Sequence, residues 1–270
     1  MHGGPLAYTI LVIAALLSLF PLYWTVVAAS TSNTRITQTP PPLVPGANLA
    51  HNLKEAYTQV HMGTALFNTF FVAGTIALST VLFATLAGFA FAKLRFKGRN
   101  IALMLLIGTM MVPPQLGVVP LFMLMGDLGW QNRLQAVILP TLVSAFGVFF
   151  MRQYLSEALP TELIEAARVD GANSLRIFWH VVVPAARPAM AVLGMLTFVH
   201  AWNDLFWPMI VLNADNPTVQ VALSQLGQGY VPDRSVIMAG ALLGTLPLLA
   251  VFTVLGKQIV GGIMQGAVKG

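Results

Sequence analysis

The stretch from Tyr154 to Pro188 reads YLSEALPTELIEAARVDGANSLRIFWHVVVPAARP, and it is the one long polar segment in the second half of an apolar chain. Its charged side chains stand between two long apolar runs; they are Glu157, Glu162, Glu165, Arg168, Asp170, Arg176 and Arg187. Because ionised side chains are costly inside a bilayer, we expect this stretch outside lipid, with a membrane span on each side of it.

Two short helices separated by a break are predicted within the stretch. Pro160 suits the first helical position, where its missing N–H leaves no bond unmade, and Glu162 then lies in the positive first turn. Helical spacing places four residues on one face, which two alanines make flat enough for another backbone to approach: Leu163, Ala166, Ala167 and Asp170.

The break itself is predicted at Gly171, since glycine readily adopts the left-handed conformation that ends helices. Asn173 or Ser174 can cap the second helix. Pro184 and Pro188 are expected to end that helix before the next apolar run begins.

Three short motifs, Glu165-Ala166-Ala167, Asp170-Gly171-Ala172 and Val183-Pro184, together resemble the EAA loop of ABC-importer permeases. The longer run EAARVDGANSLRIFWHVVVPAARP is similar to the carbohydrate-uptake branch, specifically to its maltose-permease-like second subunit. The resemblance covers most of the chain, including the closing residues 266–270. One departure is Val183, where the family usually has leucine; both residues are apolar.

The resemblance implies the type I ABC-importer permease fold, an all-α membrane protein with six transmembrane helices and a cytoplasmic coupling helix between the fourth and fifth spans. It also implies that the coupling loop, residues 152–188, docks into a groove on a separate ATPase. The residues that match the family motif there are Glu165, Ala166, Ala167, Asp170, Gly171, Ala172 and Pro184. From the residues alone, an amphipathic helix pair that merely caps the bundle remains an alternative.

The composition is that of an integral membrane protein. Of the residues, 57% are hydrophobic and 9% are charged, against about 25% charged in soluble domains. The net charge of +5 comes without a run of five basic residues, so nucleic-acid binding is not expected. The chain has no cysteine and its five histidines are scattered, so neither disulfides nor a metal site is expected. We expect a single transmembrane permease domain over residues 1–270 in the lipid bilayer.

Six apolar runs are candidates for spanning helices, each of which needs about 20 mainly apolar residues. They lie at approximately 6–29, 66–91, 101–123, 134–151, 189–212 and 237–255. The first run is longer than the about 7–15 residues of a signal-peptide core and no Lys or Arg precedes it, so we expect it to be retained as a span. The polar loop after it is expected to carry a short surface helix at residues 48–60.

Basic residues predict the orientation. The connection after the second run holds Lys93, Arg95, Lys97 and Arg99, which places it in the cytoplasm by the positive-inside bias. Alternation of the spans then gives ten Lys and Arg residues to the cytoplasmic segments and four to the outer ones. Both termini and the coupling loop are therefore expected on the cytoplasmic side.

Two of the runs hold features of a translocation path. Pro113 and Pro114 interrupt the third run, and a broken helix survives in a membrane only inside protein or beside water. Trp202, Asn203 and Asp204 lie in the fifth run, about 22 Å into it at 1.5 Å per residue. There the carboxylate should face the bundle interior, a cavity or a partner, and its neighbours could contact a sugar. A packed kink and a structural polar network remain the alternatives.

ATP hydrolysis by this chain is not expected, because Gly256-Lys257 is followed by Gln258 and lacks the upstream glycine of a phosphate-binding loop. The predicted function is the permease subunit of an ATP-driven carbohydrate importer in the cytoplasmic membrane, forming half of the pathway. We expect no cofactor on this chain, with ATP and Mg²⁺ on the ATPase. The expected partners are a homologous second permease, an ABC ATPase dimer and an extracellular or periplasmic sugar-binding protein.

Three other functions remain open. A secondary transporter driven by an ion gradient is disfavoured, because only one membrane-embedded carboxylate and no duplicated half are visible. An ABC importer of a non-sugar such as glycerophosphate would look alike at this level. A scaffold without transport would leave the prolines and Asp204 unexplained.

Overall fold

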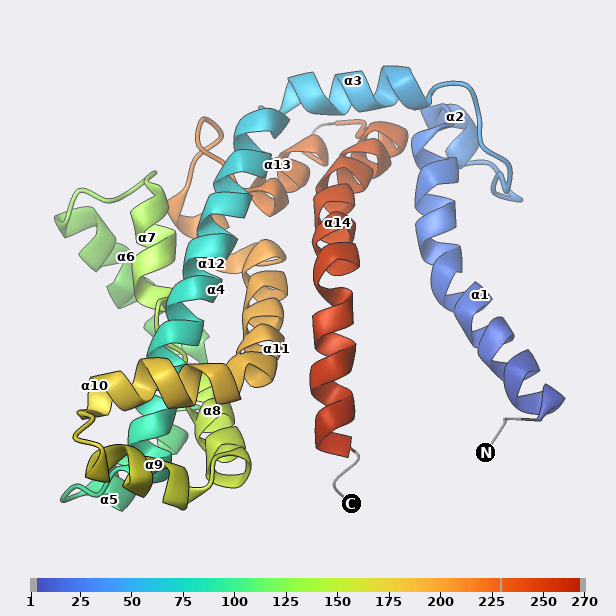
Figure 1. Cartoon of the computed structure of the whole chain (residues 1–270). Coiled ribbons are helices and arrows are strands. Elements are labelled where there is room, and N and C mark those ends of the chain that lie inside the picture. Colours follow the sequence, from blue (N-terminus) through green and yellow to red (C-terminus); the bar gives the residue numbers. More distant parts are fainter. Residues whose placement is uncertain (1–3, 229, 268–270) are drawn as a thin grey trace. The chain divides into compact units, whose positions relative to one another are not determined.

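The computed structural model describes residues 4–228 and 230–267, and throughout this part the regular elements are helices (Figure 1). In chain order they are α1 (Pro5–Ala29), α2 (Asn33–Ile36), α3 (Leu49–Gln59), α4 (Met62–Lys93), α5 (Arg99–Thr109), the 3-10 turn η1 (Pro114–Gly117), α6 (Val118–Asp127), α7 (Leu134–Ile138), the 3-10 turn η2 (Leu139–Thr141), α8 (Ala145–Ala158), α9 (Thr161–Val169), α10 (Ser174–Ile177), the π turn η3 (Phe178–Val182), α11 (Val183–Trp202), α12 (Phe206–Val211), α13 (Val219–Leu226) and α14 (Arg234–Ala267). The surface helix predicted at residues 48–60 is present as α3.

Four helices of the described chain are each long and apolar enough to cross a membrane: α1, α4, the run Ser174–Trp202 and the first part of α14. The number rises to six if each of two bent pairs forms one span, namely Arg99–Thr109 with Pro114–Asp127 and Leu134–Thr141 with Ala145–Ala158. These helices coincide with the six apolar runs, so the predicted all-α membrane fold is confirmed.

The third run is two helices rather than one kinked helix, because it bends by 87° at the prolines. Pro113 has an extended ψ of 127°, as expected for a residue that precedes proline, and Pro114 then opens η1. The fourth run has a milder bend of 41° before α8. Ser144 is the N-cap of α8, and its side chain accepts a hydrogen bond from the Gly147 N–H at 3.1 Å. This bond begins a new helix there.

The path into the fifth run differs from the prediction. Pro184 and Pro188 do not end the second helix of the polar stretch, since helical structure continues from Ser174 to Trp202. Pro184 lies in the first turn of α11, directly after the π turn, where the change of hydrogen-bond register tolerates its missing N–H. The helical path turns between α10 and α11 instead of stopping (Figure 1).

The fifth run is also shorter than predicted at its far end. Helix α11 ends at Trp202, and α12 begins only at Phe206. Between them the Asp204 carboxylate accepts a hydrogen bond from the Phe206 N–H at 3.1 Å. Such a local side-chain bond competes with continuation of the helix, and periodicity alone does not reveal it.

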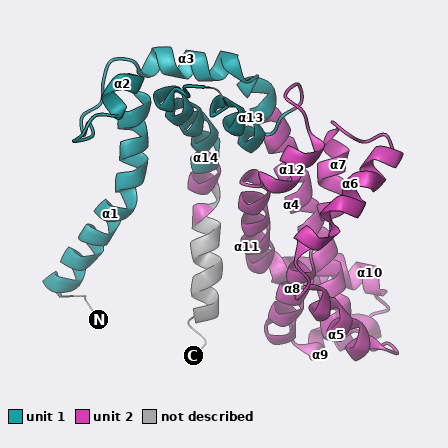
Figure 2. Cartoon of the chain, turned by 180° about the vertical axis from the view of Figure 1, so that it is seen from behind, with its two compact units in different colours: residues 1–66, 217–249 teal, residues 67–216, 250–270 magenta. Residues whose placement is uncertain are grey.

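Contacts gather the chain into two compact units, drawn in different colours in Figure 2. The first unit comprises residues 1–66 and 217–249, and the second comprises residues 67–216 and 250–270. In the first unit, α3, α13 and the adjoining ends of α4 and α14 share a buried apolar cluster that includes Ala56, Met62, Val219, Ala222 and Val236.

One buried amide fastens α3 to the end of α1 in the first unit. The Asn52 side chain is 4% exposed, and its Nδ2 donates to the Ala29 carbonyl at 2.8 Å and to the Thr31 carbonyl at 2.9 Å. These bonds satisfy carbonyls that the end of α1 leaves without helical partners.

The second unit contains two buried apolar clusters. One is built by α4, α6, α7 and α12 and includes Val72, Met125, Val137, Trp207 and Val211. Trp207 is anchored in it, since its Nε1 donates to the Ala136 carbonyl at 2.9 Å. The other cluster, called here the loop core, lies beneath the polar stretch of residues 154–188.

Candidate functional site

The first helix of the polar stretch, α9, begins one residue later than predicted. Pro160 is its N-cap, with an extended ψ of 140°, and Glu162 lies in the first turn as expected. Ile164 is buried, at 4% exposed, and Ala167, almost one turn further on, packs partly buried against the same cluster. The inner face of α9 therefore runs through Ile164 and Ala167.

The predicted alanine face is divided by this rotation of the helix. Leu163, Ala166 and Asp170 are exposed, whereas Ala167 turns toward the loop core. Ile164 has a larger apolar area than Ala166 or Ala167, and its burial decides which side of α9 faces inward.

Gly171 ends α9 in the way its sequence position predicts. Its φ is +79°, its N–H donates to the Arg168 carbonyl at 3.0 Å, and the Ala172 N–H donates to the Ala167 carbonyl at 2.9 Å. This pair of bonds is the Schellman motif, which satisfies carbonyls at a helix end. Ala167 and Ala172 both pack against the loop core and so provide the apolar contact that accompanies the motif.

Asn173 begins the second helix. Its Oδ1 accepts a hydrogen bond from the Arg176 N–H at 2.8 Å, which decides between the two caps that the sequence allowed. Four consecutive residues, 170–173, thus close one helix and open the next. The angle between α9 and α10 is set by backbone bonds rather than by a flexible linker.

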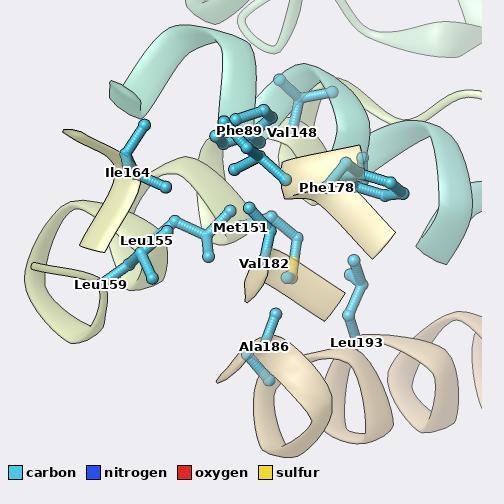
Figure 3. Packing of buried hydrophobic residues seen from close by; sticks show 13 residues of the cluster. Phe89, Val148, Met151, Leu155, Leu159, Ile164, Phe178, Val182, Ala186 and Leu193 are labelled. Carbon is cyan, nitrogen blue, oxygen red and sulfur yellow. The ribbon is translucent and has the colours of Figure 1, made fainter. Parts of the chain in front are cut away.

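The loop core holds this helix pair from beneath (Figure 3). Ile177 and Phe178 are each 1% exposed, and the Phe178 ring lies 6.3 Å from the ring of Phe89 on α4. Helices α8 and α11 complete the cluster with Val148, Met151, Leu155, Ala186 and Leu193, together with Leu159 directly after α8. Because close-packed interiors transmit displacement, a push on α9 and α10 would move α8 and α11 with them.

Gly88 positions this core, and the sequence analysis missed it. A Cβ atom at Gly88 would lie 2.8 Å from the Arg152 nitrogen and 2.8 Å from the Met151 Cβ, so α4 and α8 touch at the backbone there. Small residues permit such close approach of membrane helices. The only signal for this contact in the sequence was one glycine in a long apolar run. Other apolar runs of the chain also contain glycines, so Gly88 did not stand out.

The outward side of the loop combines acidic and large apolar residues. Val169 is 88% exposed, Leu175 is 65% exposed and Leu163 is 51% exposed. We name this the exposed loop surface and define it as Leu163, Glu165, Ala166, Val169, Asp170, Gly171 and Leu175, all of them exposed. Of the other predicted contact residues, Pro184 is also exposed and Ala172 is half-buried. Large apolar side chains that stay exposed among charges are typical of a surface that another protein covers.

The predicted path residues lie at two helix breaks of the second unit. Pro113 and Pro114 are exposed at the bend between α5 and η1 rather than packed within the unit. Trp202 is 2% exposed, with its ring 5.6 Å from that of Phe198.

Near Trp202, the polar side chains bond to the backbone of their own chain. The Asn203 Nδ2 donates to the Val199 carbonyl at 2.8 Å, and Asp204 accepts from Phe206 as described above. A role for Trp202, Asn203 and Asp204 in contacting substrate stays a prediction. Among the residues whose side chains are described, no three His, Asp or Glu residues gather in a way that could hold a metal ion.

The family model of the binding-protein-dependent transport system inner membrane component matches residues 80–264, which include the whole polar stretch. Among curated relatives, the lactose transport system permease protein LacG of Rhizobium radiobacter is 36% identical over 97% of this chain and 95% of its own length. The sn-glycerol-3-phosphate transport system permease protein UgpE of Yersinia enterocolitica is 31% identical, over 96% of this chain and 95% of its own length. The arabinooligosaccharides transport system permease protein AraQ of Halalkalibacterium halodurans is 30% identical, over 95% of this chain and 93% of its own length.

A solved structure shares the fold. It is a chain from the crystal structure of a bacterial ABC transporter involved in the import of the acidic polysaccharide alginate. The two chains superpose with a TM-score of 0.80 at 26% sequence identity, over 94% of this chain and 95% of that one.

Proposed function

This chain belongs to the family of binding-protein-dependent transport system inner membrane components, and from that premise we propose that it carries a sugar, as a permease subunit of an ABC importer. Two of the relatives are named for lactose and for arabinooligosaccharides, and the solved structure comes from a polysaccharide importer. An oligosaccharide is the substrate class that these names share. The ion-gradient and scaffold alternatives have no support from any of these relatives.

The proposed source of energy is a separate ABC ATPase dimer that binds ATP and Mg²⁺, with no cofactor on this chain. The exposed loop surface is the proposed docking site for it. The single observation that carries this proposal is the two-sided construction of the loop: acidic and large apolar residues face outward, and Ile164, Ile177 and Phe178 are buried inward. A partner that grips the outer side would therefore move the loop core.

Helices α8 and α11 leave the loop core as parts of the fourth and fifth spans. Closure of the ATPase would displace α9 and α10, and the packed core would carry that displacement into both spans. A homologous second permease would form the other half of the pathway, and a substrate-binding protein would deliver the sugar from outside. The excess of basic residues in alternate connections supports a cytoplasmic location for both termini and for the loop.

Replacement of one exposed carboxylate tests the docking proposal. In the complete reconstituted importer, Glu165→Gln should lower sugar uptake by about tenfold, as loss of an interface contact of about 1.4 kcal/mol would, while the amount of chain in the membrane stays unchanged. The matched control is Glu157→Gln on α8, because that carboxylate is also exposed but accepts from Gln153 Nε2 at 2.6 Å outside the exposed loop surface. Equal uptake by both variants would overturn the proposal.

The second candidate substrate is glycerophosphate, which the likeness to UgpE favours. Uptake of labelled disaccharide and of labelled sn-glycerol 3-phosphate by the importer with its own binding protein separates the two. Uptake of the phosphate ester alone would contradict the sugar proposal and leave the docking proposal intact.

A further inference from the structure

A pocket of about 530 Å³ lies where α4 gives way to α5 in the second unit. Its lining residues are Arg95, Phe96, Gly98, Arg99, Asn100 and Ile101. Two arginines and one asparagine are the polar residues of the lining and no acidic residue is among them, so the chemistry of the lining suits an anion. None of these residues belongs to the exposed loop surface.

No carboxylate of the described residues lies within 4.0 Å of the pocket's arginine nitrogens. Among the described residues, the only ion pair within 4.0 Å joins His51 and Glu55, far from this segment in the sequence. Arg95 is exposed, and Arg99 is held half-buried by a hydrogen bond from its Nη1 to the Leu94 carbonyl at 3.3 Å. One guanidinium is thus held by a hydrogen bond beside the pocket, and the other belongs to an exposed side chain.

Backbone groups at the start of α5 add to the positive potential. The N-cap residue is Gly98, which has no side chain to cap the helix. The first residues of the helix, Arg99, Asn100 and Ile101, also line the pocket. The leading N–H groups of a helix favour a negatively charged group. This contribution reinforces the two arginines and does not define the site by itself.

The surface next to the pocket is apolar. Ile101, Met104 and Leu105 of α5 are 63%, 65% and 64% exposed, and Phe96 is 45% exposed. Because α5 belongs to a candidate membrane span, these side chains continue from the pocket into the region of lipid acyl chains. A cationic pocket that borders an exposed apolar helix matches a molecule with an anionic head and a hydrocarbon tail.

We propose that this pocket binds the phosphate of an anionic phospholipid headgroup, whose acyl chains lie along the exposed side chains of α5. A free phosphate ion would use the same arginines, but it would gain nothing from the apolar flank. Basic pockets and clusters of Lys and Arg beside membrane helices attract anionic lipid headgroups. The inference needs only that the chain lies in a membrane, so it does not depend on the substrate or on ATPase docking.

The test measures lipid binding to the complete importer, purified in detergent and titrated with phosphatidylglycerol in native mass spectrometry. Arg95→Gln and Arg99→Gln should each weaken the tightest phosphatidylglycerol site by about fivefold or more. Lys97→Gln is the matched control, because it removes one charge from the same connection without removing a lining residue. The control should change binding by less than about twofold, and Arg95→Lys should restore most of the affinity.

Three outcomes would overturn the proposal. Equal weakening by all three glutamine variants would mean diffuse attraction of the basic segment for lipid rather than a site. Unchanged binding in the two arginine variants would mean that the pocket is covered or that lipid binds elsewhere. Displacement of phosphatidylglycerol by inorganic phosphate at equal concentration would assign the pocket to the free ion, because the acyl chains would then add nothing to binding.

Discussion

Helix α1 and the loop α9–α10 both expose large apolar side chains, but for different reasons. In α1, Leu6 is 74% exposed and Leu17 is 69% exposed. In the most apolar 18-residue stretch of this helix, 6% of the stretch is buried. In the loop, Val169 and Leu175 are exposed to a similar degree, yet they stand among Glu165, Asp170 and Arg176. Lipid covers apolar residues that come in an unbroken run, whereas charged neighbours exclude a hydrocarbon environment.

The comparison teaches that exposure of apolar residues says little until their neighbours are considered. Helix α1 needs a bilayer and little else, because its sequence is apolar on every side. The loop packs on its own core beneath, and the docking proposal adds a partner above. Four experiments test whether the two regions differ in this way.

The largest effect is expected where the loop meets its core. Phe178→Ala should destabilise the permease by about 3–5 kcal/mol, because it empties a fully buried aromatic position. Its neighbour Trp179 is 55% exposed, so Trp179→Ala should cost much less. Thermal unfolding of the purified importer and the amount of chain in the membrane measure both. Equal losses would mean that the loop is not anchored through Phe178.

A charge placed in each of the two regions should give opposite results. Leu17→Arg in the middle of α1 should disfavour membrane insertion by about 2.5–3.5 kcal/mol. Val169→Arg on the loop should leave insertion unchanged and lower uptake per inserted copy instead. Quantifying inserted chain and uptake separately distinguishes the two effects. If Val169→Arg also reduces insertion, the loop surface lies in lipid and the comparison fails.

The third experiment concerns the backbone of the loop alone. A Cβ atom at Gly171 would have no atom within 4 Å, so Gly171→Ala introduces no collision within this chain and tests the φ of +79°. A left-handed conformation costs an ordinary residue roughly 1–2 kcal/mol, and the angle between α9 and α10 should loosen. ATP hydrolysis without matching uptake is the expected result.

Asparagine tolerates the left-handed conformation, so Gly171→Asn should recover part of the coupling between hydrolysis and uptake. If Ala and Asn behave alike, the loss must be assigned to a contact of the side chain with the ATPase rather than to backbone strain.

The smallest effect is expected at the cap of α10. Asn173→Ala removes the bond to the Arg176 N–H and should cost about 1 kcal/mol, seen as a small drop in the unfolding temperature of the importer. Asn173→Asp keeps an acceptor at the same place and should be nearly neutral. A large loss of uptake with unchanged stability in Asn173→Ala would instead put Asn173 among the docking residues.

The two regions also differ in how far sequence reasoning reached. All six apolar runs are helical, because hydropathy over a long window is a property of the run itself. The break at Gly171 was also predicted, and the cap was narrowed to Asn173 or Ser174, since both features depend on bonds among residues close in sequence.

The prediction failed in two ways: at local interruptions of the helical hydrogen bonds, and where distant residues decide the outcome. It ended a helix at Pro184 and Pro188 although the π turn carries the helix through, and it ran the fifth span past Trp202 although Asp204 interrupts it. It assigned Ala167 to the open face of α9, because it did not weigh the burial of Ile164 against α8. The close approach at Gly88 depends on α8, which lies far from Gly88 in the sequence.

By itself, the sequence determined that this protein lies in a membrane, where its helices run, and that one polar stretch lies outside the lipid and breaks at a glycine. Only the tertiary structure decided which side of that stretch is held and which side is open. The physical reason is that hydropathy, caps and the left-handed turn are local energies of neighbouring residues. The inner and outer faces of α9 and α10 are instead set by packing against Phe89, Met151 and Leu193, which the chain brings together only when it folds.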